Sequence, residues 1–376
     1  MAFPHARGES GLRQALGPFA QVPAAIQSAM PIAFTSLSDL LSHGYDTVID
    51  VRSPAEFAED HIPGAINLPA LSNAERAQVG TVYKQVSPFK ARKLGAAMVA
   101  RNVADHVDGP LADKDGSWRP LVYCWRGGQR SGSVAAILTQ IGWRAETVQG
   151  GYQTFRRLVN VALYDEPLPH RLILLDGYTG TAKTAVLERL RARDVQVLDL
   201  EAMAGHRGSL LGATAGGQPS QKAFETALAV ALHALDPAHP VVVEAESSKI
   251  GRNVLPPSLW QAMLAARRIV VDAPIQARAA FLETAYADIV ARPEEVARRL
   301  QPLRYVRGHA VVDRWMTLLQ ARDVAGLATA LMQDHYDPAY AKSRRIDERE
   351  VIATLRAETL DAAGQDQLAD AVVRLL

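Results

Sequence analysis

Twice along this sequence, an apolar run leads through a glycine-containing loop into a helical pattern. The first such unit has its apolar run at 121–123, its loop at 124–131 and its helical segment at 134–138. The second has its apolar run at 171–175, its loop at 176–184 and its helical segment at 185–190. Strands that alternate with helices predict an α/β fold with mainly parallel sheets, whose ligands bind at the carboxyl ends of the strands. A chain of 376 residues has room for two such domains.

Composition limits the kinds of site that the chain can hold. A single cysteine excludes an intrachain disulfide and a thiolate-rich metal site. A formal net charge of +1 gives no overall attraction for nucleic acid, so a site for a polyanion must be a local patch. No apolar run approaches the ~20 residues that cross a bilayer, and the first residues lack a signal-peptide pattern. We therefore expect a cytoplasmic protein.

The only cysteine, Cys124, lies in the first of the two loops, five residues before Arg130. Two glycines in this loop allow successive backbone N–H groups to point inward, and the helix that follows adds its positive end. Together with Arg126 and Arg130, these groups would stabilise a nucleophilic thiolate. The alternative is a buried structural cysteine beside a solvated loop. Two glycines, two arginines and a helix start around one thiol favour the reactive interpretation.

The second loop has the pattern of a phosphate-binding P-loop in its required strand–loop–helix context. The predicted phosphate-binding residues are Gly177, Thr179, Gly180, Thr181, Ala182, Lys183 and Thr184. Lys183 would contact phosphate oxygens, and Thr184 would be a ligand for Mg²⁺. Ala182 replaces the second glycine of the motif, and the loop tolerates it if the backbone there has a negative φ. The alternative is an ordinary glycine-rich turn between a strand and a helix.

Carboxylates follow two later apolar runs, at Asp199 and at Glu244 and Glu246. In an NTPase fold, an acid in such a position binds Mg²⁺ or orients a water molecule. The sequence leaves a second possibility open, in which these acids only pair with nearby arginines and lysines.

From Ile275 onward the pattern is helical and rich in arginine, with Arg298, Arg299, Arg304 and Arg307 as the densest cluster. Guanidinium groups interleaved with aromatic rings suit an RNA surface. Because acids are mixed among them, a solvated helix face is an equally good interpretation.

Four segments of the first half resemble, in order, the signatures of a rhodanese domain. They are 50–57, 61–67, the Cys124 loop and 150–152. The resemblance implies that Cys124 carries sulfur or selenium. A Cys-x₅-Arg loop is also a signature of cysteine phosphatases, some with a rhodanese-like fold, so phosphoryl transfer by Cys124 and Arg130 is an alternative. Tyr123, where many such phosphatases have histidine, argues mildly against it.

A rhodanese domain fused to a P-loop domain resembles the tRNA 2-selenouridine synthase family. The segments 73–85, 199–201, 206–209 and 335–338 are also similar to segments of that family. The resemblance implies a transferase that converts wobble 2-thiouridine of tRNA to 2-selenouridine through an S-geranyl intermediate. Its substrates would be geranyl diphosphate and selenophosphate, with no tightly bound cofactor, Mg²⁺ as a possible ion, and selenophosphate synthetase as a possible partner. The remaining rival is a sulfur carrier with a nucleotide-gated docking module.

The predicted organisation is therefore α/β throughout. A rhodanese-like parallel-sheet domain is followed by a P-loop α/β domain with a helical C-terminal part, and a monomer is expected. The predicted boundaries are 1–34 for an N-terminal extension, 35–160 for the rhodanese-like domain, 167–275 for the P-loop domain and 276–376 for a helical region that contacts tRNA.

Overall fold

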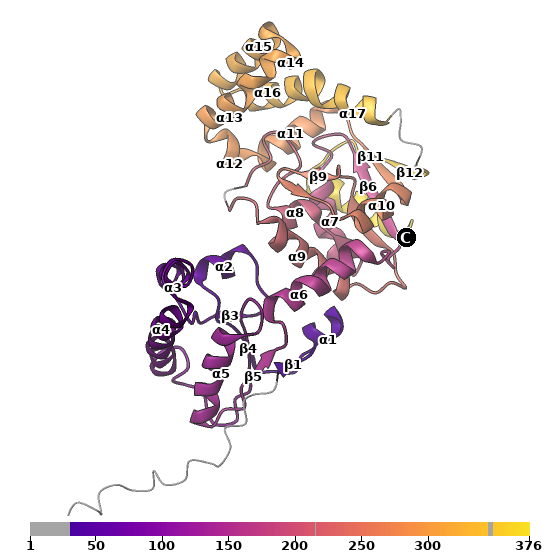
Figure 1. Ribbon diagram of the computed structural model, residues 1–376. Coiled ribbons are helices and arrows are strands. Elements are labelled where there is room, and N and C mark those ends of the chain that lie inside the picture. The colour runs from indigo at the N-terminus through magenta and orange to yellow at the C-terminus, as the bar shows by residue number, and fades with distance from the viewer. Residues whose placement is uncertain (1–30, 215, 345–348) are drawn as a thin grey trace, which may run out of the picture. The chain divides into compact units, whose positions relative to one another are not determined.

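The computed structural model describes residues 31–214, 216–344 and 349–376 (Figure 1). Most of the predicted N-terminal extension, up to residue 30, lies outside the described residues. The chain forms two compact units. Among the described residues, the first unit contains 31–33, 44–54 and 64–152, and the second contains 34–43, 55–63 and those from 153 onward.

The first unit is built on a parallel sheet of five strands in the order β1-β5-β4-β2-β3. The strands are β1 (Pro31–Ile32), β2 (Thr47–Asp50), β3 (Ile66–Asn67), β4 (Pro120–Tyr123) and β5 (Glu146–Val148). The central strand β4 is buried along its whole length and ends directly before Cys124. The predicted parallel sheet of the N-terminal domain is confirmed.

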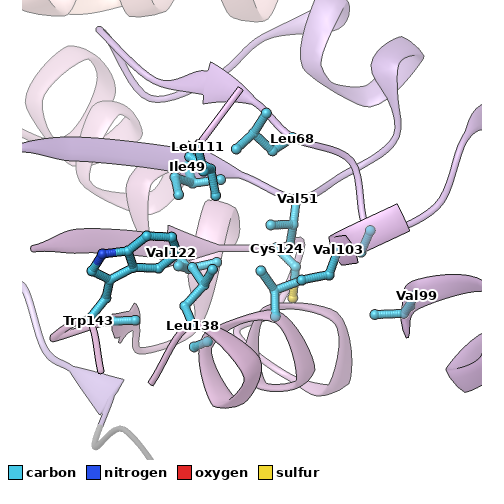
Figure 2. Close-up of a cluster of buried hydrophobic side chains, with 14 of the residues drawn as sticks. Ile49, Val51, Leu68, Val99, Val103, Leu111, Val122, Cys124, Leu138 and Trp143 are labelled. Carbon is cyan, nitrogen blue, oxygen red and sulfur yellow. The ribbon is translucent and has the colours of Figure 1, made fainter. Parts of the chain in front are cut away.

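Three helices complete the first unit: α3 (Asn73–Gln85), α4 (Pro88–Asp108) and α5 (Gln129–Ile141). Helix α3 begins at a capping box, in which the Ser72 side chain and the Glu75 side chain each bond the other's backbone N–H. Side chains of α4 and α5 meet those of β2 and β4 in one apolar core, which includes Val103, Leu138 and Cys124 (Figure 2). The cysteine therefore belongs to the apolar core of the unit.

The second unit has its own parallel sheet of five strands, in the order β12-β11-β6-β8-β7. The strands are β6 (Leu172–Gly177), β7 (Gln196–Leu198), β8 (Val241–Glu244), β11 (Arg267–Asp272) and β12 (Val351–Arg356), with a separate hairpin of β9 (Lys249–Ile250) and β10 (Asn253–Val254). The helices up to residue 265 are α1 (Leu37–Leu41), α2 (Pro54–Glu59), α6 (Gly151–Asn160), α7 (Lys183–Arg191), α8 (Leu200–Ala204), α9 (Gln221–Ala234) and α10 (Pro257–Ala265). A π-helical turn, Val161–Asp165, follows α6.

A group of helices follows β11, and buried side chains between residues 289 and 331 form an apolar core that includes the fully buried Trp315. It consists of α11 (Ile275–Ala285), α12 (Ala287–Val290), α13 (Pro293–Leu300), α14 (Arg304–Arg307), α15 (His309–Gln320), α16 (Val324–Leu331) and α17 (Asp337–Arg344), with short turns at Gln301–Leu303 and Met332–Tyr336. The expectation that the chain stays helical after Ile275 misses one strand. Strand β12 returns to the sheet beside β11, and the last helix, α18 (Ala362–Val373), packs against α7. Because β12 is an edge strand with partly exposed side chains, it lacks a buried apolar run that would reveal it.

No helix in the described parts of the chain is both long enough and apolar enough to cross a membrane.

Candidate active sites

The thiol of Cys124 is buried, with 4% of the residue exposed, at the mouth of the loop between β4 and α5. Its Sγ accepts hydrogen bonds from the backbone N–H of Gly128 and from the hydroxyl of Ser131, each at 3.3 Å. Burial alone would raise the pKa of this thiol, but the bonds from Ser131 and Gly128 and the charge of Arg130 outweigh it, so the pKa is lowered. The loop therefore favours the thiolate, as the sequence predicts.

Two glycines allow the Cys124 loop to take its shape. Gly127 and Gly151 have φ of +64° and +57°, in the left-handed region that glycine favours. A Cβ on Gly151 would lie 2.3 Å from the carbonyl oxygen of Cys124. The next residue, Tyr152, donates its backbone N–H to that same carbonyl at 2.8 Å. The segment 150–152 thus packs directly against the backbone of the cysteine loop.

A buried cation lies beside the loop and was not singled out from the sequence. Arg52 is fully buried, pairs with Asp50 at 2.6 Å, and places its guanidinium carbon 3.9 Å from the ring centroid of Tyr152. The ring of Trp125 in the loop packs on Tyr152, with centroids 5.3 Å apart. Arg126, by contrast, is exposed, and no interaction in the described structure joins it to Cys124. Of the two predicted arginines, only Arg130 acts on the thiol.

The P-loop of the second unit lies between β6 and α7, where the pattern predicts it. Lys183 begins α7, and its ammonium group donates to the carbonyl of Gly177 at 3.1 Å. Thr184 donates its hydroxyl to the carboxylate of Glu201 at 3.1 Å. The first turn of α7 leaves backbone N–H groups of these two residues without helical partners, ready to receive an anion.

Ala182 does not have a negative backbone φ. This residue has φ +57° and ψ +27°, so it adopts the left-handed conformation that the motif's glycine would adopt. Its methyl group is buried in the apolar core under α7. The loop therefore keeps its glycine-type backbone with alanine at this position, and tolerance of the alanine does not depend on a negative φ.

The P-loop opens onto a large pocket with an empty volume of about 2380 Å³, open solvent included. Of the predicted phosphate-binding residues, those that line it are Thr179, Gly180, Thr181, Ala182, Lys183 and Thr184. Gly177 lies behind the loop, where a Cβ would meet the hydroxyl of Thr181 at 2.4 Å. Its role is close packing rather than contact with a ligand.

Two partly buried carboxylates, Glu201 and Glu246, line this pocket near the P-loop, and a third, Glu244, lies behind them. Burial raises the pKa of Glu201, and burial together with the charge of Glu201 raises that of Glu246 to about 8. Glu244 is fully buried, accepts the backbone N–H of Glu201 at 2.7 Å, and has one oxygen without a partner among the described residues. Within the described chain, neither Glu244 nor Glu246 forms an ion pair with arginine or lysine. The structure thus disfavours the purely structural interpretation of these two acids.

Asp199 has a structural role. It caps α8 by accepting the backbone N–H of Ala202 at 2.9 Å, and it pairs with Arg191 at 3.4 Å. Among the described residues, no group of three or more His, Cys, Asp or Glu side chains is arranged to hold a metal ion.

A second pocket, lined almost entirely by apolar side chains, adjoins the phosphate pocket. Its empty volume is about 540 Å³, open solvent included, and its walls come from α11, α12, α13 and α16 with the turn after α16. We call it the apolar slot. The residues that line both pockets are Thr179, Ser209, Leu282, Tyr286 and Tyr336. No short motif marks the slot in the sequence, because its residues are scattered from 179 to 336.

Two family models match the chain, a rhodanese-like domain over residues 34–158 and a tRNA 2-selenouridine synthase AAA domain over residues 170–298. The tRNA 2-selenouridine synthase of Hahella chejuensis is 34% identical over 78% of this chain and 84% of that protein. This chain belongs to the tRNA 2-selenouridine synthase family. Proteins of the same name from Aeromonas salmonicida and Nitrosomonas eutropha are 41% and 37% identical, over 64% and 68% of this chain and 66% and 67% of their own lengths.

The segments that resemble the tRNA 2-selenouridine synthase family in the second unit surround the P-loop. Gly208, in the segment 206–209, lies so close to the carboxylates of Glu201 and Glu246 that a Cβ there would overlap both. Asp337, in the segment 335–338, pairs with Arg278 at 2.6 Å, and Arg278 donates to the carbonyl of Thr179 in the P-loop at 3.1 Å. These segments therefore shape one site.

The arginines predicted to hold tRNA are mostly engaged within the protein. Arg299 pairs with Glu295 at 2.6 Å, Arg304 pairs with Asp313, and Arg307 donates to the ring and carbonyl of His335. Arg298 alone of the four is exposed. Three of the four predicted arginines therefore have partners within the protein, and their contact with tRNA stays a prediction.

Proposed function

We propose that this chain converts 2-thiouridine at the wobble position of tRNA to 2-selenouridine in two transferase steps. In the first, the sulfur of the base is alkylated by geranyl diphosphate. In the second, selenium that originates from selenophosphate replaces the alkylated sulfur. The names of the family's members support the overall conversion. The two chemical steps rest on the family resemblance and on the sites in the two units.

The observation that carries this proposal is the continuity of the P-loop pocket with the apolar slot. A prenyl diphosphate has a strongly charged end and a purely hydrocarbon end, and each needs a different environment. The P-loop offers Lys183 and free N–H groups to the diphosphate, while Leu282 and Tyr286 lead from it into the slot. A nucleotide base would need polar partners for its edges, and the slot residues that are not shared with the phosphate pocket are all apolar. The pair of pockets therefore supports a prenyl diphosphate over the nucleotide of the sulfur-carrier alternative.

In the alkylation step, the base sulfur forms a bond to the first carbon of the geranyl group, and the bond from that carbon to the diphosphate oxygen breaks. The electron pair leaves with diphosphate, and the base loses its N3 proton. Lys183 and the first turn of α7 stabilise the departing charge. Thr184, Glu201 and Glu246 offer oxygen ligands of the type that Mg²⁺ takes together with phosphate, so these residues fit that ion. A bound Mg²⁺ would add positive charge at the leaving group.

In the selenation step, the selenium of selenophosphate forms a bond to carbon 2 of the base, and the bond from that carbon to the geranylated sulfur breaks. Water then cleaves the selenium–phosphorus bond, which releases phosphate and leaves the selenium on the base. Sulfur leaves as geranyl thiol, a far better leaving group than a bare sulfide. The Cys124 loop handles the selenium donor: its thiolate is stabilised by Ser131 and Gly128, and its N–H groups and Arg130 suit a phosphate. Selenophosphate synthetase would supply the donor.

The decisive experiment supplies the purified protein with tRNA bearing 2-thiouridine and adds geranyl diphosphate, then selenophosphate, with mass spectrometry of the nucleosides after each addition. We expect S-geranyl-2-thiouridine first and 2-selenouridine second. Cys124→Ser should stop the second product and keep the first, whereas Lys183→Ala should reduce the first. Unchanged tRNA together with hydrolysis of an aryl phosphate would instead establish the phosphatase alternative.

A further inference from the structure

Helices α3 and α4 form an antiparallel hairpin in the first unit (Figure 1), with Val79 against Gly95 and Asn102 bonded to Glu75. We call residues 76–104 the basic hairpin. This stretch contains no acidic residue. Its six basic residues are Arg76, Lys84, Lys90, Arg92, Lys93 and Arg101. In a chain whose formal net charge is only +1, this is a strong local concentration of positive charge.

The hairpin has a buried face and a solvent-exposed face. Gly95, Met98, Val99 and Val103 of α4 are buried, the last three in the core that includes Cys124 (Figure 2). All six basic residues are exposed. At the turn between the helices, three large apolar residues are exposed as well, Tyr83 by 56%, Val86 by 60% and Phe89 by 69%. The positive face thus ends in a tip with two aromatic rings.

Four of these basic residues have no carboxylate partner among the described residues. Lys84, Lys90, Arg92 and Lys93 form no ion pair with any residue that the structure describes. Lys90 lies in the first turn of α4, where the helix dipole disfavours a cation, and Lys93 is its neighbour of like charge one turn on. Helix stability alone therefore does not account for Lys90 and Lys93 in these positions. Arg299 and Arg304 of the second unit, by contrast, have carboxylate partners.

We propose that the basic hairpin is a tRNA-binding surface of the first unit, a step that rests on tRNA being the substrate. Lys90, Lys93 and Arg101 recur at spacings of three and eight residues, so they line one face of α4 over about 16 Å. Such a row of cations can follow an RNA backbone, while Tyr83 and Phe89 stack on unpaired bases. Cations beside exposed rings match single-stranded RNA, as in an anticodon loop, better than an acidic protein surface.

The test measures binding of a fluorescently labelled tRNA transcript by anisotropy at several salt concentrations. The charge variant is Lys84→Gln with Lys90→Gln and Lys93→Gln. Its matched control removes three other exposed charges, with Arg144→Gln, Arg171→Gln and Lys249→Gln. A plot of log affinity against log salt should lose about two units of slope in the charge variant and none in the control, at about 0.7 unit per phosphate contact. Tyr83→Ala with Phe89→Ala should weaken binding about ten- to hundredfold.

The possible results separate this inference from the function on which it rests. If the wild-type protein does not bind tRNA, the proposed substrate is wrong. If the wild type binds and the charge variant binds with equal affinity and slope, only the basic hairpin is excluded. The thermal midpoint of the charge variant should equal or exceed that of the wild type, since like charges are removed, and a large fall would show that the lysines stabilise the fold. Retained tRNA binding with loss of a protein partner would also overturn the proposal.

Discussion

Gly127 and Gly151 face each other so closely that a Cβ on Gly151 would lie 2.5 Å from the backbone nitrogen of Gly127. These two positions, 24 residues apart in the sequence, fix the backbone that carries Cys124. The thiol site is therefore built from two segments of the first unit, and its reactivity depends on both.

Gly151→Ala should destabilise the first unit and disturb the cysteine loop. Gly44→Ala is the matched control, because Gly44 also has a positive φ, of +68°, but open space around its Cα. The control should cost about 1 kcal/mol for the left-handed backbone. Gly151→Ala should cost about 1–3 kcal/mol more, because the methyl group collides with backbone. Denaturant unfolding measures both values, and equal losses would contradict the close approach.

Ser131→Ala should raise the pKa of Cys124. The variant loses the hydroxyl that donates to Sγ at 3.3 Å. A hydrogen bond to a charged group contributes about 1.5–3 kcal/mol, which corresponds to about one to two pKa units. The rate of iodoacetamide alkylation against pH reports the shift. Ser133→Ala, at an exposed position two residues on, should leave the profile unchanged, and an unmoved profile in Ser131→Ala would remove this serine from thiolate stabilisation.

The stability of Ala182 variants should reflect the left-handed backbone at this position. Ala182→Gly relieves about 1–2 kcal/mol of backbone strain but loses a buried methyl group and gains unfolded-state entropy, so stability should stay within about 1 kcal/mol of wild type. Ala182→Val should lose more than about 2 kcal/mol, since a β-branched residue is strongly disfavoured at positive φ. Ala192→Val, at an exposed position with φ −67°, serves as the control. A stable Ala182→Val protein would show that φ is negative after all.

Stability without ligands should fall as pH rises from about 4.5 to about 8. Burial beside Glu201 raises the pKa of Glu246 from 4.5 to about 8, so the folded state keeps a proton that the unfolded chain releases in this window. Because the folded state binds more protons there, the free energy of unfolding decreases with pH. Glu246→Gln should flatten this decrease by at least about 1 kcal/mol, one pKa unit being worth about 1.4 kcal/mol. Exposed Glu358→Gln should not change the slope, and parallel curves for all three proteins would place Glu246 in contact with water.

Filling the apolar slot should weaken binding of the prenyl chain without weakening binding of the diphosphate. Ala328 lines the slot, and Ala328→Phe would occupy the space of the prenyl chain. Affinity for geranyl diphosphate should fall at least about tenfold, since each excluded methylene is worth about 0.8 kcal/mol. Affinity for inorganic diphosphate should be unchanged. Calorimetry measures both, with Ala325→Phe on the same helix, outside the slot, as control. Equal loss of both ligands would mean that the substitution disturbs the P-loop instead.

The local features of both sites follow from sequence, because each is a continuous strand–loop–helix unit. The cysteine loop and the P-loop lie where their glycines and apolar runs predict. The apolar slot does not follow, because Leu282, Leu327 and Tyr336 come from separate helices and share no spacing. Whether an arginine is paired within the protein cannot be predicted from sequence, because its partner is often distant along the chain. Arg304, for example, pairs with Asp313. The basic hairpin was readable as an acid-free stretch, but the near-zero net charge of the whole chain conceals it.

The salt bridge between Arg278 and Asp337, together with strand β12, determines where the second unit can be cut. The family match ends at residue 298, yet the edge of the sheet and the anchor of the P-loop both come from beyond it. A fragment that stops there would expose the β11 edge, leave the Arg278 guanidinium without its carboxylate and lose the cover that α18 gives to α7. We therefore expect the phosphate site to require the last forty residues of the chain. A premature stop near the C-terminus should then abolish the proposed alkylation step as completely as a substitution in the P-loop itself.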